Sequence, residues 1–255
     1  MALGRFIRHL RLQFQLILAP VFLLGYKLTG AELELRFVGL FLLVHIGLYG
    51  GMTAFNSYYD RDEGPIGGMK FPPLADKLER NGGLFLQLVA VGAMAFWGWG
   101  MALAGLVILG LGVAYSHPRW RWKARPLVSL LTVAVGQGVL PFFMGIAAAN
   151  ELSGRVGSME MALAASATAI IITGLYPLTQ VYQIAEDRQR GDYTIAVYWG
   201  ADRIFFVCPE PGRGRAGRNV FFRLYCEDLP QLLAVVAAAG LPGFLVCRVG
   251  VVPAF

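Results

Sequence analysis

The stretch LFLQLVAVGAMAFWGWGMALAGLVILGLGVAYS, residues 84–116, contains 33 consecutive residues without a charged side chain. A membrane-spanning helix needs about 20 apolar residues, so this stretch forms either one over-long helix or two short helices. The segment Phe96-Trp97-Gly98-Trp99-Gly100 near its middle offers a place for a turn. The choice between one helix and two decides on which side of a membrane every later loop lies.

The distribution of basic residues separates the two alternatives. Four further uncharged stretches are present, namely Leu12–Tyr26, Phe37–Tyr59, Leu127–Asn150 and Met161–Ala185. With a cytoplasmic N-terminus and one long helix over residues 84–116, the loops place 8 Lys and Arg residues inside and 9 outside. With a hairpin, the numbers become 14 inside and 3 outside. Because cytoplasmic loops of membrane proteins are enriched in Lys and Arg, the sequence predicts the hairpin.

The composition is that of a polytopic membrane protein. Hydrophobic residues make up 56% of the 255 residues, the mean hydropathy is +0.57, and only 15% of the residues are charged. A soluble domain carries about 25% charged residues. The net charge of +6 follows from the loop bias, and no basic recognition face or motif is present, so we expect no nucleic acid as a partner. The three cysteines have no metal-binding spacing.

We therefore predict an all-α fold, a polytopic bundle of about seven to eight transmembrane helices. Six helices are expected up to residue 185, and a weaker seventh is expected to start near Thr194. The expected location is an integral one in the membrane, with a bacterial inner (plasma) membrane favoured and the N-terminus in the cytoplasm.

Two acidic clusters follow uncharged stretches. The first is Asn56-Ser-Tyr-Tyr-Asp60-Arg-Asp62-Glu63-Gly64, and the second is Gln183-Ile-Ala-Glu186-Asp187-Arg-Gln-Arg-Gly191-Asp192. Ionisable groups at a membrane-helix end are candidates for function. The four-residue spacing of Asn56 and Asp60, repeated by Gln183 and Asp187, places each pair on one helix face, and the first of these helices is expected to end near Gly64-Pro65. Only the hairpin topology brings both clusters to the cytoplasmic side, with the basic segment 117–126 between them.

This pattern indicates a divalent-metal and diphosphate site. Carboxylate and amide oxygens suit Mg²⁺, which commonly binds one or two carboxylates together with substrate phosphates. We predict Mg²⁺ as the cofactor, and its candidate ligands are Asn56, Asp60, Asp62, Glu63, Gln183, Glu186, Asp187 and Asp192. Lys123 and the neighbouring arginines would neutralise the phosphate charge. Either motif taken singly is better explained as an ordinary polar helix end in the headgroup region, and the metal site is indicated by the two together.

A diphosphate at a membrane surface indicates a polyprenyl diphosphate, whose tail needs an apolar chamber. Aromatic residues are candidates for the chamber walls and for stabilising an allylic carbocation. They are Phe55, Tyr58, Tyr59, Phe142, Phe143, Tyr176 and Tyr182. Ordinary packing or an interfacial aromatic belt is the alternative for any one of them.

Three segments give the chain a resemblance to UbiA-type intramembrane prenyltransferases over residues 10 to 203. They are Asn56-Ser-Tyr-Tyr-Asp60-Arg-Asp62, the segment from Tyr115 through Lys123 to Pro126, and the segment from Tyr182 through Asp187 and Asp192 to Gly200. The resemblance implies a helical bundle, usually of nine spanning helices, with two Asp-rich motifs that bind Mg²⁺ and a prenyl diphosphate.

The resemblance also implies roles for single residues. Asp60, Lys123 and Asp187 are the expected catalytic residues. The predicted contacts with the prenyl diphosphate are Lys70, Tyr115, Arg119, Lys123, Arg125 and Tyr182. The expected reaction moves a polyprenyl group to an aromatic or other lipid-precursor acceptor through an allylic cation. A membrane transporter and an inactive membrane scaffold are the alternatives.

The chain departs from the family pattern at three places. Gly64 stands where a third acid is usual in the first motif, and Gln183 stands where the second motif usually has Asp. The segment 204–255 is basic and rich in Pro and Gly, and only residues 229–247 could form one weak further span. We predict a prenyltransferase-like domain over 1–203 and an atypical tail produced by a change of reading frame near residues 204–208. An unusual loop followed by an eighth helix is the alternative.

Overall fold

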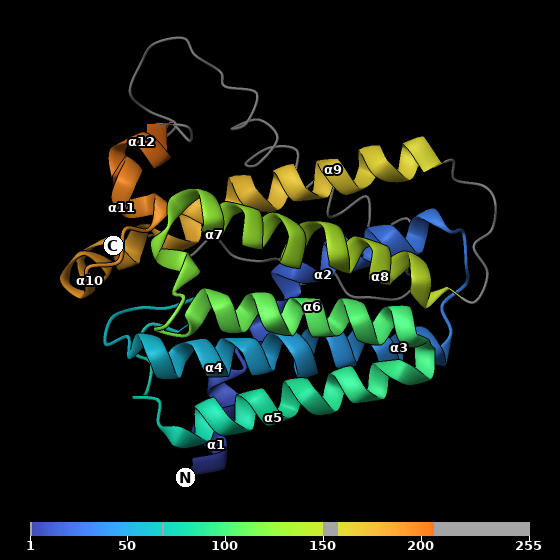
Figure 1. Ribbon diagram of the computed structural model, residues 1–255, viewed down its shortest axis with the longest axis horizontal. Coiled ribbons are helices and arrows are strands. Elements are labelled where there is room, and N and C mark those ends of the chain that lie inside the picture. Colours follow the sequence, from blue (N-terminus) through green and yellow to red (C-terminus); the bar gives the residue numbers. More distant parts are fainter. Residues whose placement is uncertain (1, 68, 150–157, 207–255) are drawn as a thin grey trace. The chain divides into compact units, whose positions relative to one another are not determined.

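The computed structural model describes residues 2–67, 69–149 and 158–206, and these residues form helices without any strand (Figure 1). The α-helices are α1 (Ala2–His9), α2 (Leu12–Leu28), α3 (Leu35–Leu42), α4 (Gly51–Asp60), α5 (Lys77–Met94), α6 (Trp99–Ser116), α7 (Pro126–Val133), α8 (Leu140–Ala148), α9 (Ser158–Leu175), α10 (Ile184–Arg190), α11 (Ile195–Trp199) and α12 (Ala201–Phe206). Two π-helical stretches, η1 (Leu43–Gly50) and η4 (Ala134–Val139), join α3 to α4 and α7 to α8. Three 3₁₀ stretches complete the set, namely η2 (Ala95–Trp97), η3 (Trp122–Ala124) and η5 (Tyr176–Gln183). The all-α prediction is confirmed for the described residues.

Five helical segments of the described chain are long and apolar enough to cross a membrane. They are Ala2–Leu28, Leu35–Asp60, Trp99–Ser116, Pro126–Ala148 and Met159–Arg190. Helix α5 has the same length as α6 but begins with Lys77-Leu-Glu-Arg80, so its mean hydropathy is lower. These five segments and α5 account for the six helices predicted up to residue 185.

The predicted hairpin within residues 84–116 is confirmed. Helix α5 starts with a capping box, in which Asp76 accepts from the backbone of the first turn and the Glu79 side chain accepts from the Asp76 N–H. The helix ends at Met94, and Gly98 turns the chain with a φ of 125°, a value that favours glycine. Helix α6 then runs back against α5 and α4 (Figure 1). The end of α6 therefore returns to the same end of the bundle as Asp60.

Close helix contacts depend on glycine. Gly25 of α2 and Gly145 of α8 lie against each other's helices, because a Cβ at Gly25 would overlap the Phe142 carbonyl oxygen and one at Gly145 the Phe22 carbonyl oxygen. Membrane helices have no hydrophobic driving force toward one another, so small residues that allow backbone contact are how they pack. The α2–α8 contact therefore fixes one wall of the bundle.

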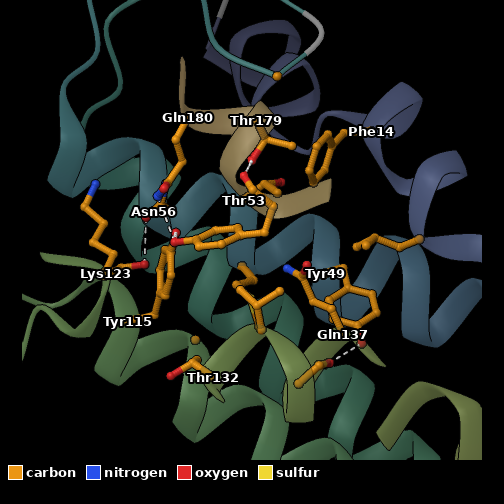
Figure 2. A pocket seen from close by; sticks show the side chains of 18 of the residues that line it. Phe14, Tyr49, Thr53, Asn56, Tyr115, Lys123, Thr132, Gln137, Thr179 and Gln180 are labelled. Atoms are coloured by element: carbon orange, nitrogen blue, oxygen red, sulfur yellow. Dashed lines mark hydrogen bonds between the residues drawn. The ribbon is translucent and has the colours of Figure 1, made fainter. Parts of the chain in front are cut away.

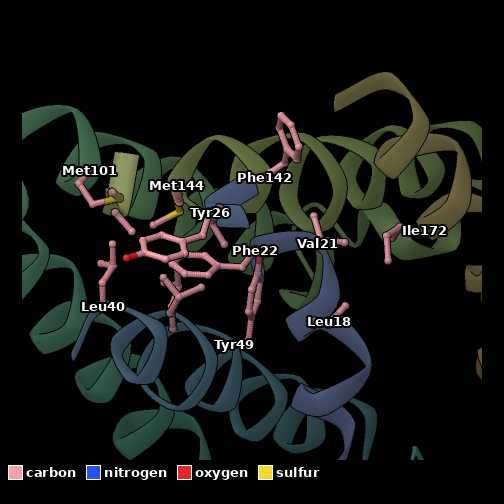
Figure 3. Close-up of a cluster of buried hydrophobic side chains, with 14 of the residues drawn as sticks. Leu18, Val21, Phe22, Tyr26, Leu40, Tyr49, Met101, Phe142, Met144 and Ile172 are labelled. Carbon is pink, nitrogen blue, oxygen red and sulfur yellow. The ribbon is translucent and has the colours of Figure 1, made fainter. Parts of the chain in front are cut away.

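A large apolar cluster fills the bundle away from the charged end. Phe22 and Tyr26 of α2 pack with Leu40, Phe142 and Met144 from α3 and α8, all with at most 4% exposure (Figure 3). Phe142, predicted as a chamber wall, is thus a core residue with no exposed surface. Its aromatic partner is Phe143, at a ring-centroid distance of 5.4 Å.

Local structure differs from the sequence prediction at two helix ends. Helix α4 stops at Asp60 rather than near Gly64, because Arg61 adopts a left-handed conformation with a φ of 50°. Gln183 closes a 3₁₀ stretch, so it precedes α10 instead of sharing one regular α-helix with Asp187. The strict four-residue spacing argument therefore holds for Asn56 and Asp60 but not for Gln183 and Asp187.

A short helix begins where the seventh span was predicted, but Gly200 interrupts it, and the described residues contain no segment there long enough to cross a membrane. The Thr194 side chain caps α11, which ends after Trp199, and α12 follows to Phe206. Residues 207–255, which hold most of the predicted tail and its weak span at 229–247, lie outside the described residues.

Candidate functional site

Three segments far apart in the sequence meet at one end of the bundle. Figure 1 shows there the end of α4 with the loop after it, the segment between α6 and α7, and helices α10 and α11. Ion pairs join these segments. Both acidic clusters and the basic segment therefore lie together, as the hairpin topology required. The sequence prediction of a common side is confirmed by these contacts.

Asp60 lies at the centre of the site. Its carboxylate is 5% exposed and forms an ion pair with Lys123 Nζ, while Arg121 Nη2 lies 3.6 Å from the same oxygen. Asn56 Nδ2 donates to the other oxygen of Asp60 at 2.7 Å. Ser116 Oγ in turn donates to Asn56 Oδ1 at 2.8 Å, which fixes the orientation of the amide. The pairing of Asn56 with Asp60 on one face of α4 is thus observed.

The turn after α6 presents two cations. Arg121 has a φ of 38° and precedes η3, which carries Lys123. The Arg121 guanidinium donates two hydrogen bonds of 2.6 Å to the two oxygens of Asp192. This fork-to-carboxylate geometry is the strong form of an arginine ion pair. It ties the basic segment to the loop between α10 and α11.

A third cation joins the two acidic clusters. Arg190 Nη1 donates to Asp62 Oδ1 and Nη2 donates to Asp187 Oδ1, both at 2.8 Å. Arg190 also donates to the backbone carbonyl oxygen of Asp60. The other oxygen of Asp187 accepts a hydrogen bond of 3.1 Å from Thr194 Oγ1. Asp62 and Asp187 are therefore held on opposite sides of one guanidinium.

The donor set fits a divalent cation. Asp60, Asp62, Asp187 and Asp192 are all at most 6% exposed, and Asp62 Oδ2 is buried without a hydrogen-bond partner. Burial raises the pKa of the Asp62 carboxyl, and the Asp60 carboxylate adds to the rise, so an added cation would favour its ionised form. Within the described residues, no three acidic, histidine or cysteine side chains converge as a ready-made metal site. Three cations, Arg121, Lys123 and Arg190, contact these carboxylates instead.

A cavity extends from the charged cluster into the bundle. Figure 2 shows Asn56 and Lys123 at one end of it and Tyr49 with Gln137 toward the other. Its polar lining near the cluster comprises Arg11, Asn56, Asp60, Tyr115, Lys123, Tyr182, Gln183, Asp187 and Thr194. Its apolar lining comprises Phe14, Ile17, Leu18, Ile108, Leu111, Val133, Ile172 and Leu175. The arrangement suits a molecule with an anionic head and an apolar tail.

Several predicted residues lie outside this cavity. Glu63, Arg119 and Arg125 are exposed and do not line it. Lys70 lines an adjoining open groove, which shares six lining residues with the cavity, Tyr182 among them. Of the predicted aromatic walls, Tyr176 and Tyr182 line the cavity, whereas the other five (Phe55, Tyr58, Tyr59, Phe142 and Phe143) do not. The family resemblance implied contacts from Arg119 and Arg125, but it carries no information on side-chain direction in the turn 117–125.

Glu186, a predicted metal ligand, contacts the first acidic loop through one oxygen, and its Oε2 is buried without a hydrogen-bond partner. Its Oε1 accepts a hydrogen bond of 2.6 Å from the backbone N–H of Gly64. A Cβ at Gly64 would lie 2.6 Å from the same oxygen, so the absence of a side chain at this position leaves room for Glu186. The carboxylate of Glu186 therefore connects the first acidic loop to α10.

Three functional candidates, Arg11, Arg190 and Thr194, were missed by sequence reasoning, and Arg121 was counted only among the arginines near Lys123. Arg11 is buried at the break between α1 and α2, lines the cavity and donates to Ser57 Oγ at 2.8 Å. Arg121, Arg190 and Thr194 contact the acidic side chains directly. A signal existed for Arg190, since it follows Asp187 by three residues and both share a helix face. No comparable signal marked Arg11, which the sequence presents as a flank of the first apolar stretch.

Comparisons with known proteins agree with this architecture. A UbiA homolog from Archaeoglobus fulgidus bound to DMAPP and Mg²⁺ has a TM-score of 0.62 at 20% identity, over 79% of this chain and 72% of that chain. The structure of a UbiA homolog from the same organism bound to GPP and Mg²⁺ has a TM-score of 0.60 at 21% identity, over 93% of this chain and 79% of that chain. At this identity the likeness shows the fold. No curated protein matches the chain.

The family assignment comes from a sequence-family model. The model of the UbiA prenyltransferase family matches residues 17–249, a range that runs past residue 203. The change of reading frame near residues 204–208 stays a prediction, and resequencing of the gene there tests it. With most of its length matched and the same helical fold, the chain belongs to the UbiA prenyltransferase family.

Proposed function

We propose that this chain transfers a polyprenyl group from its diphosphate to an aromatic or other lipid-precursor acceptor, such as a quinone precursor, at the cytoplasmic face of a membrane. One observation carries the proposal: a buried cluster of carboxylates and cations closes one end of an apolar cavity. The solved UbiA homologs bound to DMAPP or GPP with Mg²⁺ support it. The positive-inside charge distribution supports a cytoplasmic N-terminus, and we expect a bacterial inner membrane.

The chain's residues have distinct roles in this proposal. Lys123 and Arg121 lie beside Asp60 and would bind the diphosphate and stabilise the negative charge that develops as it departs. Tyr115 and Tyr176, whose hydroxyl groups lie 2.8 Å apart, line the cavity next to the cluster. Their rings can stabilise an allylic cation by cation–π attraction. The apolar lining would exclude water from that cation until the acceptor attacks.

Mg²⁺ is the proposed cofactor, with Asn56, Asp60, Asp62 and Asp187 as the residues that would hold it. When bound, it would neutralise phosphate charge and so make the diphosphate a better leaving group. Each of these residues offers a hard oxygen, and Asp62 has one that no hydrogen bond uses.

Membranes containing the chain, supplied with radiolabelled prenyl diphosphate and a panel of acceptors, test the proposal. We expect incorporation with Mg²⁺ and none with EDTA. Asp60→Ala and Asp187→Ala should each abolish it, since each removes a buried carboxylate at the closed end of the cavity. Arg188→Gln, an exposed change on α10, is the matched control and should retain activity. Metal-independent incorporation, or near-normal turnover in either aspartate variant, would contradict the assignment.

A further inference from the structure

Arg190 occupies the space between the two acidic clusters. Its guanidinium contacts Asp62 Oδ1 and Asp187 Oδ1 at 2.8 Å each, and its Nε lies 3.7 Å from Asp192 Oδ2. It is half-buried at the C-terminal end of α10, and the φ of 76° at Gly191 turns the chain directly after it. One side chain thus links three carboxylates that come from two separate parts of the chain.

The same oxygens cannot serve Arg190 and a bridging metal together. A Mg²⁺ ion binds oxygens at about 2.1 Å in near-octahedral geometry, so an ion that bridges Asp62 Oδ1 and Asp187 Oδ1 would take the space between them that the Arg190 guanidinium fills. A guanidinium between Asp62 and Asp187 also repels a divalent cation at close range. Asp62 Oδ2, buried without a partner, is the oxygen that a cation can contact first. Binding of a metal between the clusters therefore requires Arg190 to move.

A displaced Arg190 has Asp192 as its one remaining carboxylate contact, and Asp192 is already paired with Arg121, so a bound phosphate would offer it an anion with free oxygens. The planar guanidinium matches a phosphate as well as a carboxylate, by two parallel hydrogen bonds. Without such a partner, its release would leave a charged group in a half-buried position. The position of Arg190 beside Asp187, which lines the cavity, places it next to the proposed diphosphate site.

We propose that Arg190 is a built-in counter-ion, which holds the two acidic clusters together without metal and passes to the diphosphate when metal enters. This role rests on the proposed function and adds to it a dependence of metal binding on bound diphosphate. Metal alone binds weakly because it competes with Arg190, and diphosphate strengthens metal binding because it accepts the released guanidinium. The chain thereby avoids holding a metal site open when no prenyl diphosphate is bound.

The test measures two affinities of the purified full chain in detergent micelles. The first is the affinity for Mn²⁺ alone, followed by electron paramagnetic resonance, and the second is the retention of labelled inorganic pyrophosphate at a fixed Mn²⁺ concentration. For Arg190→Gln we expect Mn²⁺ alone to bind about tenfold tighter, because one positive charge in contact with the ligands is removed. We expect pyrophosphate to bind about tenfold more weakly, because the variant lacks the guanidinium that donates two parallel hydrogen bonds to a phosphate.

Two further variants separate this role from general effects. Arg188→Gln changes the net charge equally on the same helix and should match the wild type in both affinities. Arg190→Lys keeps the charge, so Mn²⁺ should bind as in the wild type, while pyrophosphate should bind more weakly. If Arg190→Gln does not fold, unchanged pyrophosphate binding by Arg190→Lys overturns the proposal on its own.

The outcomes also distinguish this role from the proposed function. A wild-type chain that binds neither Mn²⁺ nor pyrophosphate contradicts the proposed function. A wild-type chain that binds both, with Arg190→Gln equal to Arg188→Gln, overturns the role of Arg190 alone.

Discussion

The contact between Lys123 and Asp60 makes a strong prediction about stability and activity together. Both side chains are about 5% exposed, and Lys123 Nζ bonds to Asp60 Oδ1. Breaking a buried ion pair by removing one partner leaves an uncompensated charge, with a loss of about 3–5 kcal/mol. For Lys123→Met we expect about 3 kcal/mol, the lower end of this range, because Arg121 and Asn56 still contact the Asp60 carboxylate.

The reverse change removes the other partner. For Asp60→Asn we expect a loss within the same range of about 3–5 kcal/mol, because the Lys123 ammonium stays buried without its carboxylate. The double variant Asp60→Asn/Lys123→Met removes both charges and should lie within about 1 kcal/mol of the wild type, since neutral replacement of a buried pair is often tolerated. The free energies of unfolding of the wild type and the three variants, measured by reversible denaturation in mixed micelles, give the coupling energy of this double-mutant cycle.

Across the same four proteins, prenyl-transfer activity should not follow the free energy of unfolding. The double variant should fold like the wild type yet stay inactive in prenyl transfer, because both charges are needed at the diphosphate end of the cavity. If Lys123→Met unfolds with the wild-type free energy, the buried pair does not contribute as argued. If the double variant is as unstable as the sum of the single variants, the two side chains are not energetically coupled.

Two further predictions concern packing and charge. Gly145→Ala should lower the free energy of unfolding by about 1–3 kcal/mol, because its Cβ overlaps the Phe22 carbonyl oxygen on α2. Gly110→Ala on α6 is the control, because a Cβ there meets nothing within 4 Å. It should leave the free energy of unfolding unchanged or raise it by up to about 1 kcal/mol. Equal melting shifts for both variants would refute the α2–α8 contact. Arg121→Gln should reduce prenyl transfer at least tenfold, since it loses a forked ion pair with Asp192 and a charge near Asp60. Arg119→Gln, an exposed change two residues away, should have a much smaller effect, and equal losses would restore the sequence-based choice of Arg119.

The sequence predicted the parts of this molecule that depend on hydrophobicity and net charge. The hairpin at Gly98 and the common end of the two acidic clusters follow from apolar length and loop charge, which are summed over many residues. The identity of the paired cations does not follow from such sums. It depends on backbone direction at single turns, as at Arg121, which has a left-handed conformation and pairs with Asp192, whereas Arg119 is exposed.

The residues with left-handed backbone near the site show why side-chain pairing could not be predicted from the sequence. Among the described residues, Arg11, Arg61 and Arg121 are the non-glycine residues with positive φ, at 48°, 50° and 38°. Such a conformation costs about 1–2 kcal/mol for an L-residue, so it persists only where contacts offset it. Arg121 is offset by its fork with Asp192, and Arg11 by its bond to Ser57 beside the cavity.

Each of these turns also ends a helix or joins two at the charged end of the cavity. Arg11 separates α1 from α2, Arg61 ends α4 directly after Asp60, and Arg121 precedes the 3₁₀ turn that carries Lys123. A regular helix through Arg61 would place Asp62 about 200° around the axis of α4 from Asp60, whereas here one guanidinium, that of Arg190, contacts both residues. The strained turns at these arginines are therefore the turns that direct charged groups of the site toward one another. Backbone strain and the convergence of Asp60, Asp62 and Lys123 thus occur together.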